Sequence, residues 1–232
     1  MSLFTIGDLH LSNGVDKPMD VFGGRWENYM EKLADGLSVL KQDDTLVICG
    51  DVSWGMGLDE CLADMKYIDA LPGQKIILKG NHDYWWNTAT KIKAYFAQNE
   101  ISTISILHNN CYFYNDIAIC GSRGWFYEEN THGGEHDKKI MNREVQRVKA
   151  SLMAAGDCKD KRVFLHYPPR FNDFVCTDII DLLNEFGVKH CYYGHIHGIG
   201  HKFAVTGPIG GIEFHMVSAD YTGFKPILIS KD

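Results

Sequence analysis

Five short motifs in this sequence carry side chains that could bind metal ions. In chain order they are Asp8-Leu9-His10, Gly50-Asp51, Gly80-Asn81-His82-Asp83, His166 and Gly194-His195-Ile196-His197. Their carboxylate, imidazole and amide groups are oxygen and nitrogen ligands of divalent transition metals. Each motif alone is weak evidence, but all five in order, each closing an apolar run, strongly indicate a two-metal site.

The first two motifs supply two carboxylates and one imidazole. Asp8 and His10 are two residues apart at the end of an expected strand, so their side chains leave on the same face. Gly50 permits a tight turn before Asp51, and the two oxygens of that carboxylate can bridge metal ions about 3.5–4 Å apart. Alone, Asp8 and His10 fit a surface strand end, and Asp51 fits a helix cap.

The other motifs add an amide and further imidazoles. The Asn81 amide oxygen can bind a metal without adding charge, while His82 can face a substrate with Asp83 orienting its ring. The last two motifs contribute imidazoles only, from His166, His195 and His197. The two-residue spacing of the final pair repeats that of the first motif, a common arrangement in metal sites.

The apolar pattern of the first third predicts the elements that position these motifs. Continuous apolar runs predict strands at Leu3–Ile6, Thr45–Cys49 and Lys75–Leu78, and helical spacing predicts helices at Trp26–Leu40 and Leu58–Leu71. This alternation implies parallel strands in one sheet. Ligands of such sheets gather beyond the carboxyl ends of the strands, where the first three motifs fall.

The pattern changes after a helical stretch at about Thr88–Gln98. Short strands at Ile104–Leu107, Cys111–Tyr114 and Ile117–Cys120 predict a meander in a second sheet. Later strands are predicted at Val163–Leu165, His190–Tyr193, Lys202–Val205, Ile212–Val217 and Lys225–Ile229, and later helices at about Glu135–Ala155 and Thr177–Phe186. We expect a single domain over 1–232, with a lid-like loop and helix inserted at about 121–155.

The composition indicates a soluble globular protein. The chain has 232 residues, of which 45% are hydrophobic and 23% charged. The net charge of −7 argues against a general electrostatic grip on nucleic acid. Seven cysteines without a C-x-x-C pair favour a reducing, cytoplasmic setting. We expect no signal peptide and no membrane span; the oligomeric state is not predicted.

With these motifs, the chain resembles the calcineurin-like metallophosphoesterase superfamily, whose pattern is D-x-H, G-D-x-x-D, G-N-H-D/E, a lone H and G-H-x-H. The resemblance spans residues 8 to 197 and implies an α/β fold, a four-layer α/β/β/α sandwich of two mixed sheets flanked by helices, with a dimetal site at one edge. One departure is Trp54, which stands where many relatives have the last acidic residue of G-D-x-x-D.

The resemblance also implies roles for the motif residues. One metal would be held by Asp8, His10, Asp51 and His197, and the other by Asp51, Asn81, His166 and His195. His82, supported by Asp83, would protonate the leaving group or steady the phosphate. The metals would be two divalent ions, Mn, Fe or Zn, and a metal-bridging hydroxide would attack phosphorus in line.

Substrate contacts are less specific in the sequence. Aromatic residues follow strand ends near the expected site, at Trp54, Trp85, Trp86, Trp125, Phe126 and Tyr127. They could form an aromatic rim for a base or an apolar group, or they could pack loops against the sandwich. Arg123 could clamp a phosphate or form a structural salt bridge. Lys139, Arg143 and Arg147 could guide anionic substrates or form a solvated helix face.

Three functions fit the sequence. The first is hydrolysis of phosphodiesters or phosphomonoesters of a small phosphorylated molecule. The second is a nuclease, which the acidic balance disfavours. The third is a non-catalytic binding scaffold, which we rank last because every motif residue of the predicted metal site is present.

Overall fold

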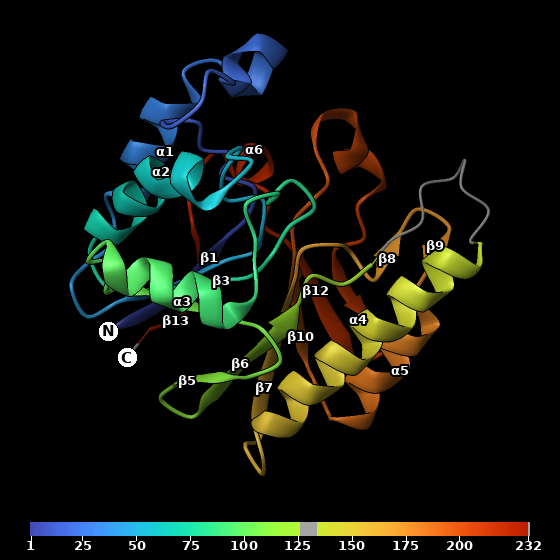
Figure 1. Cartoon of the computed structure of the whole chain (residues 1–232). Helices are drawn as coiled ribbons and strands as arrows, with labels where there is room; N and C mark the ends of the chain where they lie inside the picture. The colour runs from blue at the N-terminus through green and yellow to red at the C-terminus, as the bar shows by residue number, and fades with distance from the viewer. Residues whose placement is uncertain (126–133, 232) are drawn as a thin grey trace.

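The computed structural model describes residues 1–125 and 134–231, and two mixed sheets pack face to face at its centre. The first sheet has the strand order β13-β1-β2-β3-β4, and the second has the order β11-β12-β10-β7-β6-β5. Helices α1, α2 and α3 lie beside the first sheet, and α4 and α5 lie beside the second (Figure 1). The predicted four-layer α/β/β/α sandwich is confirmed.

The elements have the following bounds. The strands are β1 (Ser2–Ile6), β2 (Thr45–Ile48), β3 (Gln74–Ile77), β4 (Ile104–Ile106), β5 (Tyr112–Tyr114), β6 (Ile117–Ser122), β7 (Asp160–Leu165), β8 (Arg170–Phe171), β9 (Phe174–Val175), β10 (His190–Tyr193), β11 (Gly207–Ile209), β12 (Ile212–Met216) and β13 (Ile227–Lys231). The helices are α1 (Tyr29–Leu37), α2 (Leu58–Ala70), α3 (Ala89–Gln98), α4 (Glu135–Ala154), α5 (Thr177–Glu185) and α6 (Ala219–Thr222), with 3-10 turns η1 (Met19–Phe22), η2 (Gly24–Trp26) and η3 (Gly198–Phe203).

Strand alternation explains why four layers form. In β2, Leu46 and Ile48 face α1 to α3, while Val47 packs into the core between the sheets. In β7, Phe164 enters that same central core, while Val163 packs toward α4 and α5. Because successive side chains of a strand point to opposite faces, strands that are apolar on both faces need a layer on each side.

Backbone hydrogen bonds join the two sheets beside the predicted site. The Gly7 N–H donates to the carbonyl of Val217 at 2.7 Å, and the Ala219 N–H donates to the carbonyl of Gly7 at 3.0 Å. This contact ties the end of β1 to the end of β12. The motifs that follow strands of both sheets are therefore held at a common edge.

Three sequence predictions differ from the structure. The strand near Ile104 runs parallel to β3 in the first sheet, instead of joining the meander, because α3 is a crossover that returns the chain to that sheet. The helix predicted at Trp26–Leu40 begins only at Tyr29, after its left-handed N-cap residue Asn28 with a φ of 54°, and ends at Leu37. The strand predicted at Lys202–Val205 overlaps the 3-10 turn η3, whose apolar residues Ile199 and Phe203 are exposed and gain nothing from a sheet.

The predicted insertion at about 121–155 is described in part. Helix α4 buries Met141, Val148 and Leu152 in the core between the second sheet and α5. The helix is therefore part of the outer layer on this side. Residues 126–133, which include Phe126 and Tyr127, lie outside the described residues, so a lid there stays a prediction.

Candidate metal centre

Five strand ends bring the predicted metal ligands to one edge of the sandwich. Asp8, Asp51 and Asn81 follow β1, β2 and β3 of the first sheet, and His166 and His195 follow β7 and β10 of the second. In the first sheet, β2 is parallel to both β1 and β3. In the second sheet, β7 and β10 are parallel. The carboxyl ends of these five strands meet where a ligand site of an α/β sheet is expected.

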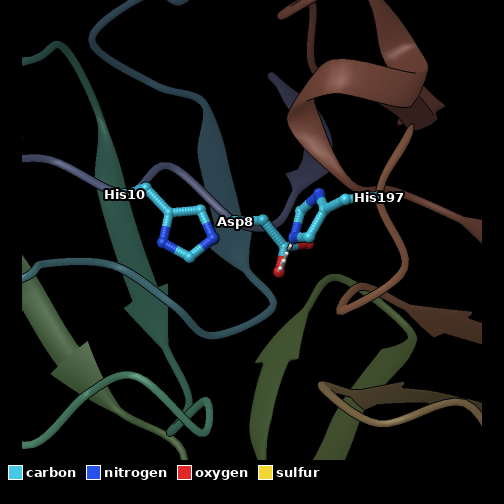
Figure 2. A group of neighbouring side chains, drawn as sticks. All are labelled: Asp8, His10 and His197. Carbon is cyan, nitrogen blue, oxygen red and sulfur yellow. Dashed lines mark ion pairs between the residues drawn. The ribbon is translucent and has the colours of Figure 1, made fainter. Parts of the chain in front are cut away.

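Two groups of possible metal ligands share Asp8. The ligand atoms of Asp8, His10 and His197 all lie within 4.8 Å of one another (Figure 2). The ligand atoms of Asp8, Asp51 and His166 meet the same limit. In the first group, His197 Nε2 lies 3.5 Å from Asp8 Oδ1. Asp8 and His10 are buried, whereas the His197 side chain is 29% exposed. The first group therefore opens to solvent on the His197 side.

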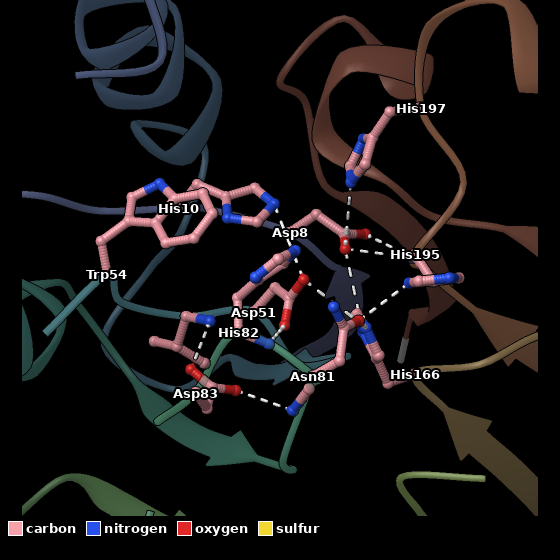
Figure 3. A network of polar contacts seen from close by, with 12 residues as sticks. Asp8, His10, Asp51, Trp54, Asn81, His82, Asp83, His166, His195 and His197 are labelled. Atoms are coloured by element: carbon pink, nitrogen blue, oxygen red, sulfur yellow. Dashed lines mark hydrogen bonds and ion pairs between the residues drawn. The ribbon is translucent and has the colours of Figure 1, made fainter. Parts of the chain in front are cut away.

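The second group extends to the amide of Asn81. His166 Nε2 lies 2.5 Å from Asn81 Oδ1, and His195 Nδ1 lies 2.9 Å from the same oxygen (Figure 3). Asp51 Oδ2 lies 3.5 Å from His166 Nε2 and 3.7 Å from His10 Nε2. This carboxylate oxygen thus stands between the two groups, as a bridging ligand would.

The backbone of the predicted ligands is strained. Asp8, His10, Asp51 and His195 have φ values of 59°, 48°, 49° and 74°, in the left-handed region that residues with a side chain avoid. Each such residue costs on the order of 1–3 kcal/mol, and such strain concentrates at functional sites. The surrounding sheet ends hold these four residues in conformations that aim their side chains together.

Glycines make room for the two carboxylates. A Cβ on Gly194 would collide with Asp8 Oδ2, and a Cβ on Gly80 would collide with Asp51 Oδ1. Only residues without a side chain therefore allow the backbone to approach these oxygens so closely. The glycines of the G-N-H-D and G-H-x-H motifs are part of the site geometry.

The charges of the site fit a bound cation. Among the described residues, Asp51 Oδ2 and His10 Nδ1 are buried without a hydrogen-bond partner. Burial, and then the charges of Asp8 and Asp83, raise the pKa of Asp51 well above its ordinary value. Burial lowers the pKa of His166 to about 4, so its imidazole is neutral. A neutral His166 imidazole beside a buried Asp51 carboxylate without a hydrogen-bond partner is a donor set that suits divalent metals.

Two hydrogen bonds fix the imidazoles with one nitrogen toward this centre. The Nδ1 atom of His166 donates to the carbonyl of Cys49 at 3.0 Å, which leaves Nε2 facing Asn81. The Nδ1 atom of His197 donates to Asp220 Oδ1 at 2.8 Å, which leaves Nε2 facing Asp8. Carbonyls and carboxylates behind ligating histidines commonly set their tautomer in this way.

Asp220 was not predicted from the sequence as a residue of the site. Its second carboxylate oxygen accepts from the Gly198 N–H at 3.1 Å, so the side chain ties the His197 loop to α6. Burial opposes ionisation of Asp220, but the hydrogen bond and charge of His197 lower its pKa. The same partner raises the pKa of His197: burial would lower it, but Asp8 and Asp220 raise it to about 10. An acidic residue just beyond β12 was the only sequence signal.

The family of this protein follows from its match to a known family model. The model of the family described as calcineurin-like phosphoesterase matches residues 1–198. The chain belongs to this family. A search of curated proteins gives no match, and among the described residues no helix has both the length and the apolar character needed to cross a bilayer.

Solved structures share the phosphoesterase fold at low identity. The phosphopantetheinyl hydrolase PptH from Mycobacterium tuberculosis is 14% identical, with a TM-score of 0.60, and the match covers 100% of this chain and 96% of that one. AQ665 from Aquifex aeolicus, a protein of unknown function, is 17% identical, with a TM-score of 0.51 and coverages of 98% and 95%. These similarities show the fold alone.

In this phosphoesterase, His82 and Asp83 do not form the predicted pair. The Asp83 carboxylate accepts hydrogen bonds from the N–H groups of Val52 at 2.8 Å and Gly80 at 2.7 Å, and from Trp85 Nε1 at 3.0 Å (Figure 3). It is therefore engaged by the loops around the site instead of the His82 ring. The His82 N–H donates to Asp51 Oδ1 at 2.7 Å, which holds its half-buried ring over the centre.

The aromatic residues divide between site and core. Trp54 stacks on His10, with ring centroids 4.9 Å apart, and contacts His82 at 4.6 Å. Trp85 is fully buried in the core beside α3, which contradicts its prediction as a substrate contact, because no solvent-facing surface remains. Trp54 thus fills the position of the family acidic residue with a ring that supports two histidines of the site.

Arg123 and Trp125 lie behind the centre. The Arg123 guanidinium stacks over Trp125, 4.9 Å from the ring centroid. It also lies 3.5 Å from Glu144, so the predicted structural salt bridge is present. The Arg123 carbonyl accepts from the N–H groups of His166 at 3.1 Å and Tyr167 at 2.9 Å, which anchors this loop to the site.

An apolar cavity opens in front of the centre. It has a volume of about 570 Å³, and its wall includes His10, His82 and His197 of the site. The rest of the wall is formed mainly by η1 and η2, including Met19, Phe22 and Trp26, with Trp54. An apolar cavity with a few converging polar groups is the usual form of a small-molecule site.

Proposed function

We propose that this phosphoesterase is a dimetal hydrolase of small-molecule phosphate esters. The carrying observation is the position of Asp51 Oδ2, a buried oxygen without a hydrogen-bond partner among the described residues, between imidazoles of the two groups. One ion would be held by Asp8, His10, Asp51 and His197, and the other by Asp51, Asn81, His166 and His195. Mixed oxygen and nitrogen donors suit Mn, Fe or Zn.

The metals and the protein divide the chemistry. Two divalent ions supply a water of lowered pKa and charge stabilisation at the phosphoryl oxygens. His82 faces the cavity beside the centre and is the residue placed to give a proton to the leaving oxygen or to donate to the phosphoryl group. Burial lowers its pKa from the ordinary value. Trp54 and Asp51 restrict its ring and its backbone, so His82 needs little reorganisation.

Three observations support the proposed reaction and substrate class. The cavity beside His10 and His197 holds about 570 Å³, the size of a small ligand site rather than of a polymer groove. A fold neighbour named as a phosphopantetheinyl hydrolase supports hydrolysis as the reaction. The net charge of −7 disfavours the nuclease alternative.

The test compares hydrolysis of bis-p-nitrophenyl phosphate and p-nitrophenyl phosphate by full-length protein, with Mn²⁺ and with chelator. We expect turnover that chelator abolishes, and the preferred ester distinguishes diesterase from monoesterase. His82→Asn should lower kcat on the order of a hundredfold while metal content stays the same. Bound metal without turnover of either ester would favour the scaffold function, and cleavage of DNA at higher rates than either ester would favour the nuclease.

A further inference from the structure

A second cavity lies beside α4, at the same strand-end edge of the sandwich as the metal centre. It holds about 510 Å³ and is bounded by the ends of β3, β4 and β6, the start of α3 and one face of α4. Its wall carries basic side chains from each of these segments except α3: Lys79, His108, Arg123, His136, Arg143 and Arg147. It therefore differs in chemistry from the apolar cavity in front of the centre.

Positive charge exceeds negative charge in this basic cavity. Among the described lining residues, Glu144 is the one carboxylate. It is fully buried and already accepts hydrogen bonds from Ser122 Oγ at 2.7 Å and Arg147 Nη1 at 2.5 Å. This one carboxylate, already hydrogen-bonded, shares the cavity wall with four lysine and arginine side chains, those of Lys79, Arg123, Arg143 and Arg147. The protein as a whole has a net charge of −7. The excess is local and is not a consequence of composition.

Several groups in the basic cavity are placed to receive an anion. Arg123 Nε is buried without a hydrogen-bond partner among the described residues, and stacking on Trp125 holds its guanidinium plane. Helix α3 begins at the wall, where its N-cap residue Thr88 lines the cavity, so the positive end of the helix dipole faces inward.

The basic cavity is connected to the metal centre through the backbone at two places. Lys79 directly precedes Gly80 and Asn81 of the third motif. On the other side, the carbonyl of Arg123 accepts from the N–H of His166. The segments that carry these cations therefore also carry predicted metal ligands.

We propose that the basic cavity binds a second phosphate group of the substrate, so that the preferred substrate is a phosphodiester carrying a further phosphomonoester. The inference rests on the proposed function, since it assigns the cavity to the same substrate. Guanidinium groups that a buried carboxylate pre-positions, as Glu144 does for Arg123 and Arg147, match the planar, bidentate recognition of phosphate.

The binding test uses thymidine 3′,5′-bisphosphate and thymidine 5′-monophosphate, titrated into full-length protein with Mn²⁺ and with chelator. We expect the bisphosphate to bind at least about tenfold more tightly with Mn²⁺, and Arg143→Gln to remove that advantage. With chelator, the bisphosphate should still bind and Arg143→Gln should weaken it. Arg143 is exposed, so this variant should fold.

Lys139→Gln is the matched control. Lys139 lies on the same helix, one turn before Arg143; it is exposed and does not line the cavity. Lys139→Gln removes the same charge as Arg143→Gln and should leave the affinities for the bisphosphate and for the monophosphate unchanged. Equal weakening by the two variants would mean diffuse electrostatic attraction and would overturn the subsite. Tighter binding of citrate than of the bisphosphate would assign the cavity to carboxylates and also overturn the proposal.

The turnover test separates this proposal from the proposed function. The substrates are thymidine 5′-(p-nitrophenyl phosphate) with and without a 3′-phosphate, and the expected gain is about tenfold in kcat/KM, mainly through KM. If neither is hydrolysed, the proposed function fails while the binding test still decides the cavity. If both are hydrolysed equally and the bisphosphate has no binding advantage, only the subsite proposal fails.

Discussion

The metal centre and the basic cavity bury carboxylates in opposite ways. In the centre, Asp51 has an oxygen without a partner among the described residues, and burial and neighbouring acids raise its pKa. In the cavity, Glu144 is equally buried but is satisfied by Ser122 and two arginines. The difference teaches that the centre is built at the expense of stability and needs a cation, whereas the cavity is internally paired and has positive charge left over.

Asp51→Asn tests the centre and should have the largest effect. Activity toward bis-p-nitrophenyl phosphate should fall on the order of a thousandfold, about 4 kcal/mol, because the oxygen proposed to bridge both ions is replaced. In chelator-treated protein the same change should raise the free energy of unfolding by about 1–2 kcal/mol, because an uncompensated buried charge is removed. Kinetics and urea unfolding measure the two effects.

Asp43→Asn is the control for this prediction, since Asp43 is exposed and its replacement should change neither quantity. A metal-free Asp51→Asn protein less stable than the metal-free wild type would break the comparison, because the centre would then be as well paired as the cavity.

Glu144→Gln tests the cavity. It should lower the free energy of unfolding, whereas Asp51→Asn should raise it in the metal-free protein. Removing the charge leaves Arg123 and Arg147 without their counter-charge, so the free energy of unfolding should fall by about 3 kcal/mol in urea titrations. Glu185→Gln, at an exposed position on α5, should fall within about 0.5 kcal/mol of wild type. An unchanged stability for Glu144→Gln would show that the arginines do not depend on it.

Asp220→Ala sharpens the description of the centre. Loss of the carboxylate behind His197 should weaken metal binding by about 10–100-fold, because the imidazole is no longer held in one tautomer and orientation. Competition with a chelating dye measures the affinity. Asp220→Asn keeps an acceptor for His197 and should recover part of the loss; equal loss in both variants would point to charge instead of orientation.

Trp54→Leu should have the smallest effect. Loss of the ring that stacks on His10 and contacts His82 should lower kcat/KM by about three- to tenfold, in line with about 0.5–1.5 kcal/mol for an aromatic pair. Trp54→Phe keeps a stacking ring and should stay closer to wild type. A loss larger than that of Asp220→Ala would move Trp54 into direct substrate contact.

The sequence located the centre because its signals are local. Strand ends such as Ile48 to Asp51 combine an apolar run, a glycine turn and a polar residue within a few positions, and the parallel order of β1, β2 and β3 follows from their alternation with helices. Three errors arose where the outcome depended on distant packing. Trp85 faces the core, β4 joins the first sheet and Asp83 is engaged by backbone groups.

By itself, the sequence determined the order of the motifs and the alternation of strands and helices in the first third, because strand-end chemistry and apolar periodicity are properties of short segments. The four-layer sandwich was implied by the family resemblance that these motifs carry. Only the tertiary structure decided what surrounds the centre. Asp220 lies 23 residues beyond its partner His197, and Glu144 meets Ser122 from a different element. Such contacts depend on how the sheets and helices dock, and no spacing along the chain encodes the distance between atoms from separate layers.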